Sequence, residues 1–209
     1  MGLTDSARLV EACLRGAAPA EVAELAQRVA EGAEGRAGLG VVFDESADGR
    51  WGPPPRHLRW TPLYWAIMQK HGALALRLLE LGAAAEGRAG GSPGHDNSPL
   101  LRASMFGDEL GGEGVDVVGA LLARGADANT KNDNGTTALM FAIERGHLRV
   151  ARQLLAAGAD AGVRETCGGR TARSIRAAKG ISASELPLPG DDADGGGGKG
   201  GGGGGGGGW

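Results

Sequence analysis

The sequence predicts an all-α solenoid of stacked antiparallel helix pairs, joined by loops of the β-hairpin type and followed by a disordered, glycine-rich tail. Three observations predict this fold class. A phrase with the features of a helix ending recurs three times, a threonine or serine precedes it at a regular distance, and the apolar pattern changes phase between the two. The helix pair is therefore the expected repeating unit.

The recurring phrase is LLELGAAAE from Leu78, LLARGADAN from Leu121 and LLAAGADAG from Leu154. In each copy, two leucines precede a glycine by three or four residues. A buried last turn followed by a glycine in the left-handed conformation is a common way for a helix to end. Each phrase is therefore expected to end the second helix of a pair.

The start of each unit is marked by a residue that can cap a helix. Thr61 lies 21 residues before Gly82, and Thr137 lies 21 residues before Gly158. A hydroxyl can accept hydrogen bonds from the first N–H groups of a helix, and a proline such as Pro62 suits the first helical position. Between start and end, two sets of apolar residues follow the i, i+3, i+4 rule in different phase, which predicts two short helices rather than one long one.

The middle unit is longer than its neighbours. It starts at Ser98, and its terminal Gly125 lies 27 residues further on, six more than in the other two units. The excess is the sequence DELGGE, residues 108–113. A solenoid accepts insertions in its loops, so we place this one between the two helices of the unit.

A unit that combines G-x-T-P-L-x-x-A, G-H-L-x-x-V and L-L-x-x-G-A-D-x-N resembles the ankyrin repeat. The best copy is NGTTALMFAIERGHLRVARQLLAAGADA, Asn134 to Ala161. The resemblance extends over residues 5–180. It departs from the family where Tyr64, Leu101 and Met140 replace the usual histidine, which affects single hydrogen bonds but leaves the apolar pattern intact.

The predicted organisation has seven parts. They are a divergent N-terminal capping helix pair (1–37), an inserted hairpin or loop (38–58), a first repeat with an extended hairpin (59–97), a second repeat with the insertion (98–130), a third repeat (131–163), a degenerate C-terminal cap (164–185) and an acidic, then glycine-rich, disordered tail (186–209).

The sequence offers no arrangement of residues that predicts catalysis, a cofactor or a metal site. The histidines occur singly, without the spacing of a metal motif, and the two cysteines lack C-x-x-C spacing. Cys13 falls on an apolar helix face, which favours a core position. Lys199 lies in GGGGKG but lacks the serine or threonine and the flanking strand and helix of a phosphate loop. We expect a non-enzymatic protein with no cofactor, metal or small-molecule substrate.

The resemblance to the ankyrin family implies a protein partner, bound through the hairpin tips and the exposed positions of each first helix. Carried onto this sequence, these positions are His57, Trp60, Met68 and Gln69 in the first repeat, His95, Asn97, Met105 and Phe106 in the second, and Lys131, Asp133, Asn134, Thr136, Glu144 and Arg145 in the third. Trp60, Met105 and Phe106 are the expected anchors, because methionine and aromatic side chains often carry binding energy. The alternative for the aromatic residues is packing against an inserted loop.

Two other functional hypotheses depend on the ends of the chain. MGLTDS matches the pattern for myristoylation of Gly2, although Thr4, Asp5 and Ser6 would equally cap a helix. The chain would reach a membrane only if Gly2 is acylated.

At the other end, a basic stripe with a spacing of three could bind an acidic partner, or bind RNA together with the glycine-rich tail. Alternatively, it could form the solvated exterior of a cap neutralised by Asp191, Asp192 and Asp194. The stripe consists of Arg170, Arg173, Arg176 and Lys179.

The net charge of −3 gives no general support for nucleic-acid binding. No stretch of 18 consecutive apolar residues predicts a membrane span. We expect a monomer in the cytoplasm, with the nucleus as the alternative compartment.

Overall fold

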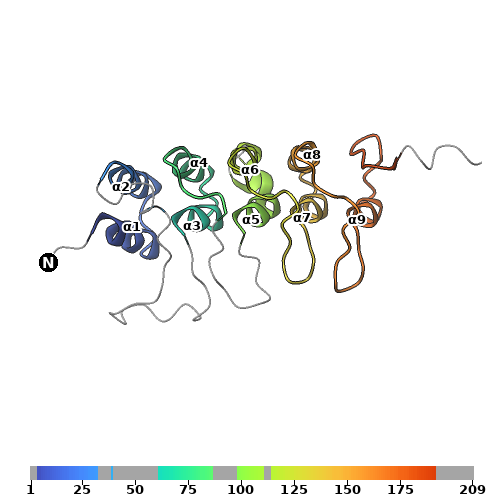
Figure 1. Ribbon diagram of the computed structural model, residues 1–209, viewed down its shortest axis with the longest axis horizontal. Helices are drawn as coiled ribbons and strands as arrows, with labels where there is room; N and C mark the ends of the chain where they lie inside the picture. The colour runs from blue at the N-terminus through green and yellow to red at the C-terminus, as the bar shows by residue number, and fades with distance from the viewer. Residues whose placement is uncertain (1–3, 33–38, 40–60, 87–97, 111–113, 192–209) are drawn as a thin grey trace, which may run out of the picture.

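The computed structural model describes residues 4–32, 39, 61–86, 98–110 and 114–191. Its helices form pairs that stand in a row (Figure 1). The pairs are α1 (Asp5–Leu14) with α2 (Pro19–Glu31), α3 (Pro62–Met68) with α4 (Gly72–Glu80), α5 (Pro99–Phe106) with α6 (Gly114–Ala123), and α7 (Ala138–Arg145) with α8 (Leu148–Ala156). In the described part of the chain, α9 (Ala172–Ala178) ends the row without a second α-helix.

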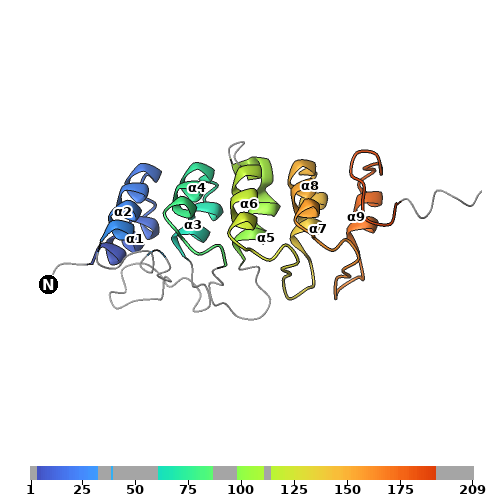
Figure 2. The ribbon, with the colours of Figure 1, turned by 45° about the horizontal axis from the view of Figure 1, so that its top comes forward.

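The pairs stack so that the helices lie in two layers. Helices α1, α3, α5, α7 and α9 form one layer, and α2, α4, α6 and α8 form the other (Figures 1 and 2). Each helix packs against its own partner and against the equivalent helices of the neighbouring pairs. The predicted all-α solenoid of stacked helix pairs is confirmed.

Four threonines cap first helices, among them Thr4, whose side chain accepts a hydrogen bond from the Ala7 N–H at 3.2 Å. The side chain of Thr61 accepts a hydrogen bond from the Tyr64 N–H at 3.2 Å, and Thr137 accepts one from the Met140 N–H at 3.3 Å. Thr171 makes the same contact at the start of α9. Ser98 makes no side-chain capping bond, so its replacement of threonine does change the cap of α5. The glycines of the ending phrase have the expected positive φ angles, 101° at Gly82, 88° at Gly125 and 87° at Gly158.

The loops before α7 and α9 are hairpins that hang below the first-helix layer in Figure 1. Lys131 and Thr137 form an antiparallel bridge in the first of them. In the second, the Glu165 N–H donates to the Arg170 carbonyl at 2.9 Å. The Thr166 N–H donates to the Asn134 carbonyl at 2.8 Å, so the two hairpins are bonded to each other. The predicted hairpin or loop at 38–58 lies outside the described residues except for Leu39, which is buried.

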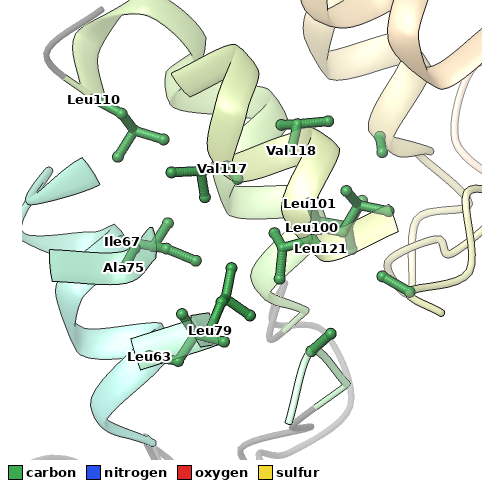
Figure 3. Packing of buried hydrophobic residues seen from close by; sticks show 14 of the residues in the cluster. Leu63, Ile67, Ala75, Leu79, Leu100, Leu101, Leu110, Val117, Val118 and Leu121 are labelled. Atoms are coloured by element: carbon green, nitrogen blue, oxygen red, sulfur yellow. The ribbon is translucent and has the colours of Figure 1, made fainter. Parts of the chain in front are cut away.

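The second repeat departs from its neighbours at a core position. Six residues after the capping position, α3 has Ile67 and α7 has Ile143, but α5 has Ser104, and all three are fully buried. The Ser104 hydroxyl has no hydrogen-bond partner. The insertion supplies one further buried side chain, Leu110, which belongs to the same hydrophobic cluster as Ile67 and lies next to Val117 in Figure 3. We interpret Leu110 as the apolar group that replaces the missing isoleucine.

The first part of the insertion is a 3₁₀ helix, η2 (Gly107–Leu110), which contacts both neighbouring repeats. Lys70 of the preceding repeat forms an ion pair with Glu109. His147 of the following repeat lies against Gly107, where a Cβ atom would come within 2.3 Å of the imidazole ring. Asp108 approaches the Nδ1 atom of His147 at 3.8 Å. Gly107 is therefore required both by this close approach and by its φ of 45°.

The C-terminal boundary of the folded part differs from the prediction. The tail was expected to begin at residue 186, but Leu186 and Leu188 are buried, with 0% and 3% exposure. Asp191 accepts a hydrogen bond from the Leu188 N–H at 2.7 Å and binds Arg176. The predicted boundary is wrong because residues 181–191 cover the apolar end of the stack that a second helix after α9 would otherwise cover. Residues 192–209 lie outside the described residues.

Candidate protein-binding surface

Three first helices present predicted binding residues at equivalent positions. We call these residues the first-helix surface: Met68, Gln69, Met105, Phe106, Glu144 and Arg145. They form the last residues of α3, α5 and α7 or directly follow them, and these helices are neighbours in one layer. Gln69 and Arg145 are exposed, and the other four are partly exposed. A partner could therefore contact all three helices at once.

The hairpin before α7 contributes a second group of predicted residues. Lys131, Asp133 and Asn134 are exposed near its tip. Thr136 is only 6% exposed, and its hydroxyl donates to Glu165 at 2.9 Å. Thr136 thus stabilises the packing of two hairpins and is removed from the candidate surface. The remaining predicted residues, His57, Trp60, His95, Asn97 and Gly2, lie outside the described residues.

Lys70, in the turn between α3 and α4, has an unusual backbone conformation. Its φ is 60°, and it is the one residue other than glycine with a positive φ in the described part of the chain. The equivalent residue between α7 and α8 is Gly146, with φ 80°. A residue with a side chain costs about 1 kcal/mol in this left-handed region, whereas glycine adopts it freely. The first repeat therefore holds a lysine at a strained position that glycine would fill without strain.

The contacts that Lys70 makes are exposed. Its Nζ atom lies 5.4 Å from the centroid of the Phe106 ring. It also pairs with Glu109, and the two side chains are 47% and 48% exposed. The hydrogen bond from Lys70, followed by its charge, lowers the pKa of Glu109 below its ordinary value. Exposed pairs of this kind stabilise a fold only weakly, because water competes for both charges. We call Met68, Lys70, Met105, Phe106 and Glu109 the Lys70 patch.

Two further residues on this face, Arg102 and Phe141, were absent from the sequence prediction. Arg102 donates from Nε to the Tyr64 hydroxyl at 3.1 Å and from Nη1 to the Met105 sulfur at 3.6 Å. Arg102 and Phe141 are partly exposed and precede Met105 and Glu144 by three residues. Residues three apart share a helix face, so this spacing could have identified both. No comparable pattern in the sequence points to Lys70, because its role depends on the conformation of a turn.

The basic stripe does not form a continuous cationic surface. Arg170 binds Glu165 at 2.7 Å and Glu144 at 3.2 Å, and these carboxylates, Glu165 first, raise the pKa of its guanidinium. Arg176 is 8% exposed and pairs with Asp191. Arg173 donates to the Pro189 carbonyl at 2.8 Å, and Lys179 is exposed. Asp191 thus neutralises this region as one of the sequence alternatives predicted, while Asp192 and Asp194 lie outside the described residues.

Of the two cysteines, Cys13 is buried and Cys167 is exposed. Cys13 is 1% exposed, and burial raises the pKa of its thiol to about 12, which keeps it protonated. Over the ranges that the structure describes, no three histidine, cysteine, aspartate or glutamate side chains gather as a group that could hold a metal ion. Within the same ranges, no helix combines the length and apolar character needed to cross a membrane.

Comparison with known proteins identifies the repeat type. A family model described as ankyrin repeats (many copies) matches residues 121–175, from within α6 into α9. Residues 121–175 form ankyrin repeats. This agrees with the paired helices of the structure, which extend the same arrangement on the N-terminal side of the matched region.

A curated relative gives a second, partial match. The chain is 38% identical over 85 residues to a protein of Oryza sativa subsp. japonica described as a probable E3 ubiquitin-protein ligase. The match covers 41% of this chain and 15% of that protein. The chain therefore spans only a small part of the relative's length.

Proposed function

We propose that the protein is a non-enzymatic protein-interaction module that binds one partner through the first-helix surface and the tip of the hairpin before α7. The observation that carries this proposal is the alignment of Met68, Met105 and Glu144 at one position of three adjacent helices. Partly exposed methionine and phenylalanine side chains supply adaptable apolar contacts, and the neighbouring charged residues supply specificity. Ankyrin repeats imply protein partners in general, which supports the same proposal.

The rigid stack explains how such a surface would be held in place. Each first helix is fixed by its own partner helix and by the helices before and after it. The exposed residues are thus presented by packed elements rather than by loops, so little conformational entropy is lost when a partner binds. We propose a monomer that acts in the cytoplasm or nucleus. We do not transfer ligase activity to this chain, since the match covers 15% of the relative.

The test is affinity capture with the whole chain immobilised, followed by quantitative mass spectrometry. One variant combines Met68→Ala, Met105→Ala and Arg145→Ala, which removes contacts from all three helices. A matched control combines Arg124→Ala and Arg149→Ala, two exposed cations on the second helices. Circular dichroism and thermal unfolding establish that both variants keep the fold.

The proposal predicts that a protein captured by the parent and by the control is lost from the first-helix variant. That protein is then purified, and its binding to the three chains is measured by calorimetry. Equal capture by all three chains would refute the role of the first-helix surface. A captured nucleic acid or lipid in place of a protein would refute the proposed partner class.

A further inference from the structure

Building on the proposed function, we infer that the Lys70 patch recognises an acidic peptide segment of the partner, in which a carboxylate side chain binds Lys70 and an adjacent apolar side chain packs on Phe106 and Met105. Glu109 occupies the carboxylate position in the unbound protein and is displaced on binding. The inference names the chemistry of one part of the first-helix surface, and three observations carry it.

The first observation is the strain at Lys70. In the third repeat, the equivalent turn has Gly146 at the position of Lys70. The fold therefore does not require a side chain at this position of the turn. The exposed contacts of Lys70 with Phe106 and Glu109 contribute little to the folded state. Strained residues that the fold does not need are concentrated at functional sites. A complex in which the lysine is desolvated would give it a larger favourable interaction than it has in the free protein.

The second observation is that the structure already contains a carboxylate at Lys70. Glu109 binds its Nζ atom, yet about half of each side chain is exposed, so a competing carboxylate can reach the lysine from solvent. Glu109 belongs to η2, a single short turn, and exchange of one carboxylate for another leaves the charge of Lys70 satisfied throughout. The ion pair therefore shows the geometry that a partner carboxylate would adopt.

The third observation is the apolar surface beside the lysine. The Phe106 ring lies beneath the Lys70 ammonium, and Met105 directly precedes it on α5. Both side chains pack in part against the protein and remain in part exposed. A carboxylate beside a leucine, methionine or phenylalanine matches this combination of one cation and an apolar floor. The protein carries a net charge of −3, which does not favour a polyanionic nucleic acid as the partner, so we choose a peptide.

The experiment uses the full chain and a displayed library of random twelve-residue peptides as the probe. The peptide that binds most tightly is synthesised with its carboxylates intact and with each changed to the amide. Fluorescence anisotropy then gives dissociation constants for the parent, Lys70→Gly, Glu109→Gln and Arg149→Gln. Arg149→Gln is the matched control, because Arg149 is an exposed cation on α8, outside the first-helix surface.

We expect enrichment of peptides with Asp or Glu next to an apolar residue. Lys70→Gly should weaken binding about ten-fold or more, and Arg149→Gln should change it less than about two-fold, as expected for loss of a charge-assisted contact against loss of an exposed charge outside the first-helix surface. Glu109→Gln should tighten binding. Changing the critical peptide carboxylate to an amide should weaken binding to the parent but not to Lys70→Gly. Lys70→Gly should unfold at a temperature no lower than the parent, which separates its binding defect from any loss of fold.

Peptides that bind Lys70→Gly as tightly as the parent would overturn the acidic-peptide inference while leaving the interaction module intact. The same holds if the selected peptides lack carboxylates, or if single-stranded RNA binds the parent and loses affinity in Lys70→Gly. Failure of the parent to select any peptide, together with failure of the affinity capture described above, would overturn both proposals.

Discussion

The second and third repeats solve the same packing problem in different ways. In the third repeat, α7 buries Ile143 and turns directly into α8 through Gly146. In the second, α5 buries Ser104, and the chain passes through η2 and buries Leu110 before α6. Both routes give a continuous apolar core between neighbouring pairs. The difference shows that a core position can be filled by a residue of another segment, provided that the volume is replaced.

The same insertion also connects repeats. Glu109 binds Lys70 of the first repeat, and Asp108 and Gly107 lie against His147 of the third. The turn of the third repeat contributes His147 to these contacts. The second repeat therefore gains both a core residue and polar contacts from six additional residues.

The largest effect that would test this comparison is expected for Leu110→Ala. Leu110 is fully buried, and removal of its side chain should leave a cavity in the core. We expect a loss of about 2–5 kcal/mol in the free energy of unfolding. Urea denaturation followed by circular dichroism measures it. A loss below about 0.5 kcal/mol would mean that Leu110 has no role in the core.

The hairpin of the third repeat is held by polar contacts to Glu165 rather than by apolar packing. The substitution Glu165→Gln tests these contacts. The Glu165 side chain is 3% exposed and binds both Thr136 and Arg170. The amide keeps the shape but loses the charge, so stability should fall by about 1–3 kcal/mol. Glu144→Gln removes the more exposed partner of Arg170 and should have a much smaller effect. Equal losses from the two changes, measured by urea denaturation, would contradict this ranking.

The replacement of isoleucine by Leu110 can be examined directly by restoring the isoleucine. Ser104→Ile should destabilise the parent, because Leu110 already fills the space, but should recover about 1 kcal/mol in the Leu110→Ala background. The non-additivity of a double-mutant cycle is the measurement. Additive effects would show that residues 104 and 110 occupy separate parts of the core.

The smallest effect concerns α9, which in the described part of the chain has no second α-helix after it, unlike the four helix pairs before it. Asp191 ties residues 186–191 to this helix, and its hydrogen bond from Arg176 lowers its pKa below the ordinary 3.8. The ionised form of Asp191 stabilises the fold. Its contribution to the free energy of unfolding is complete well above pH 4 and disappears as the pH falls through the pKa that Asp191 has in the folded protein. Asp191→Asn should therefore lower the melting temperature by a few degrees at pH 7, and the difference from the parent should shrink below pH 4. A difference that is constant with pH would show that Asp191 acts without its charge.

The sequence was sufficient for the repeat architecture, because local signals determine it. Thr61 and Thr137 cap helices and Gly82, Gly125 and Gly158 end them, and these contacts lie within a few residues of each other. The boundary of the C-terminal cap was wrong for the opposite reason. Leu186 and Leu188 are buried by packing on α9 and the end of the stack, and nothing in LPLPGDD itself distinguishes them from a linker.

The candidate surface was predictable only in part. The resemblance to the ankyrin family implied Met105 and Glu144 as binding residues, and helical spacing would have added Arg102 and Phe141. It could not show that Thr136 is buried against Glu165, since that contact joins two hairpins. It also could not show that Lys70 adopts a left-handed conformation above Phe106, because this depends on the turn of one repeat and the helix of the next.

The relation between Ser104 and Leu110 has a consequence for how related sequences diverge. If the insertion supplies the apolar volume that Ser104 lacks, the two changes constrain each other during descent. A lineage that deletes residues 108–113 would be under selection to regain a branched aliphatic residue at position 104. A lineage with isoleucine at position 104 could lengthen the turn after α5 only by residues that do not include a buried leucine. The length of one loop and the identity of one helical residue should therefore change together, as a single inherited character.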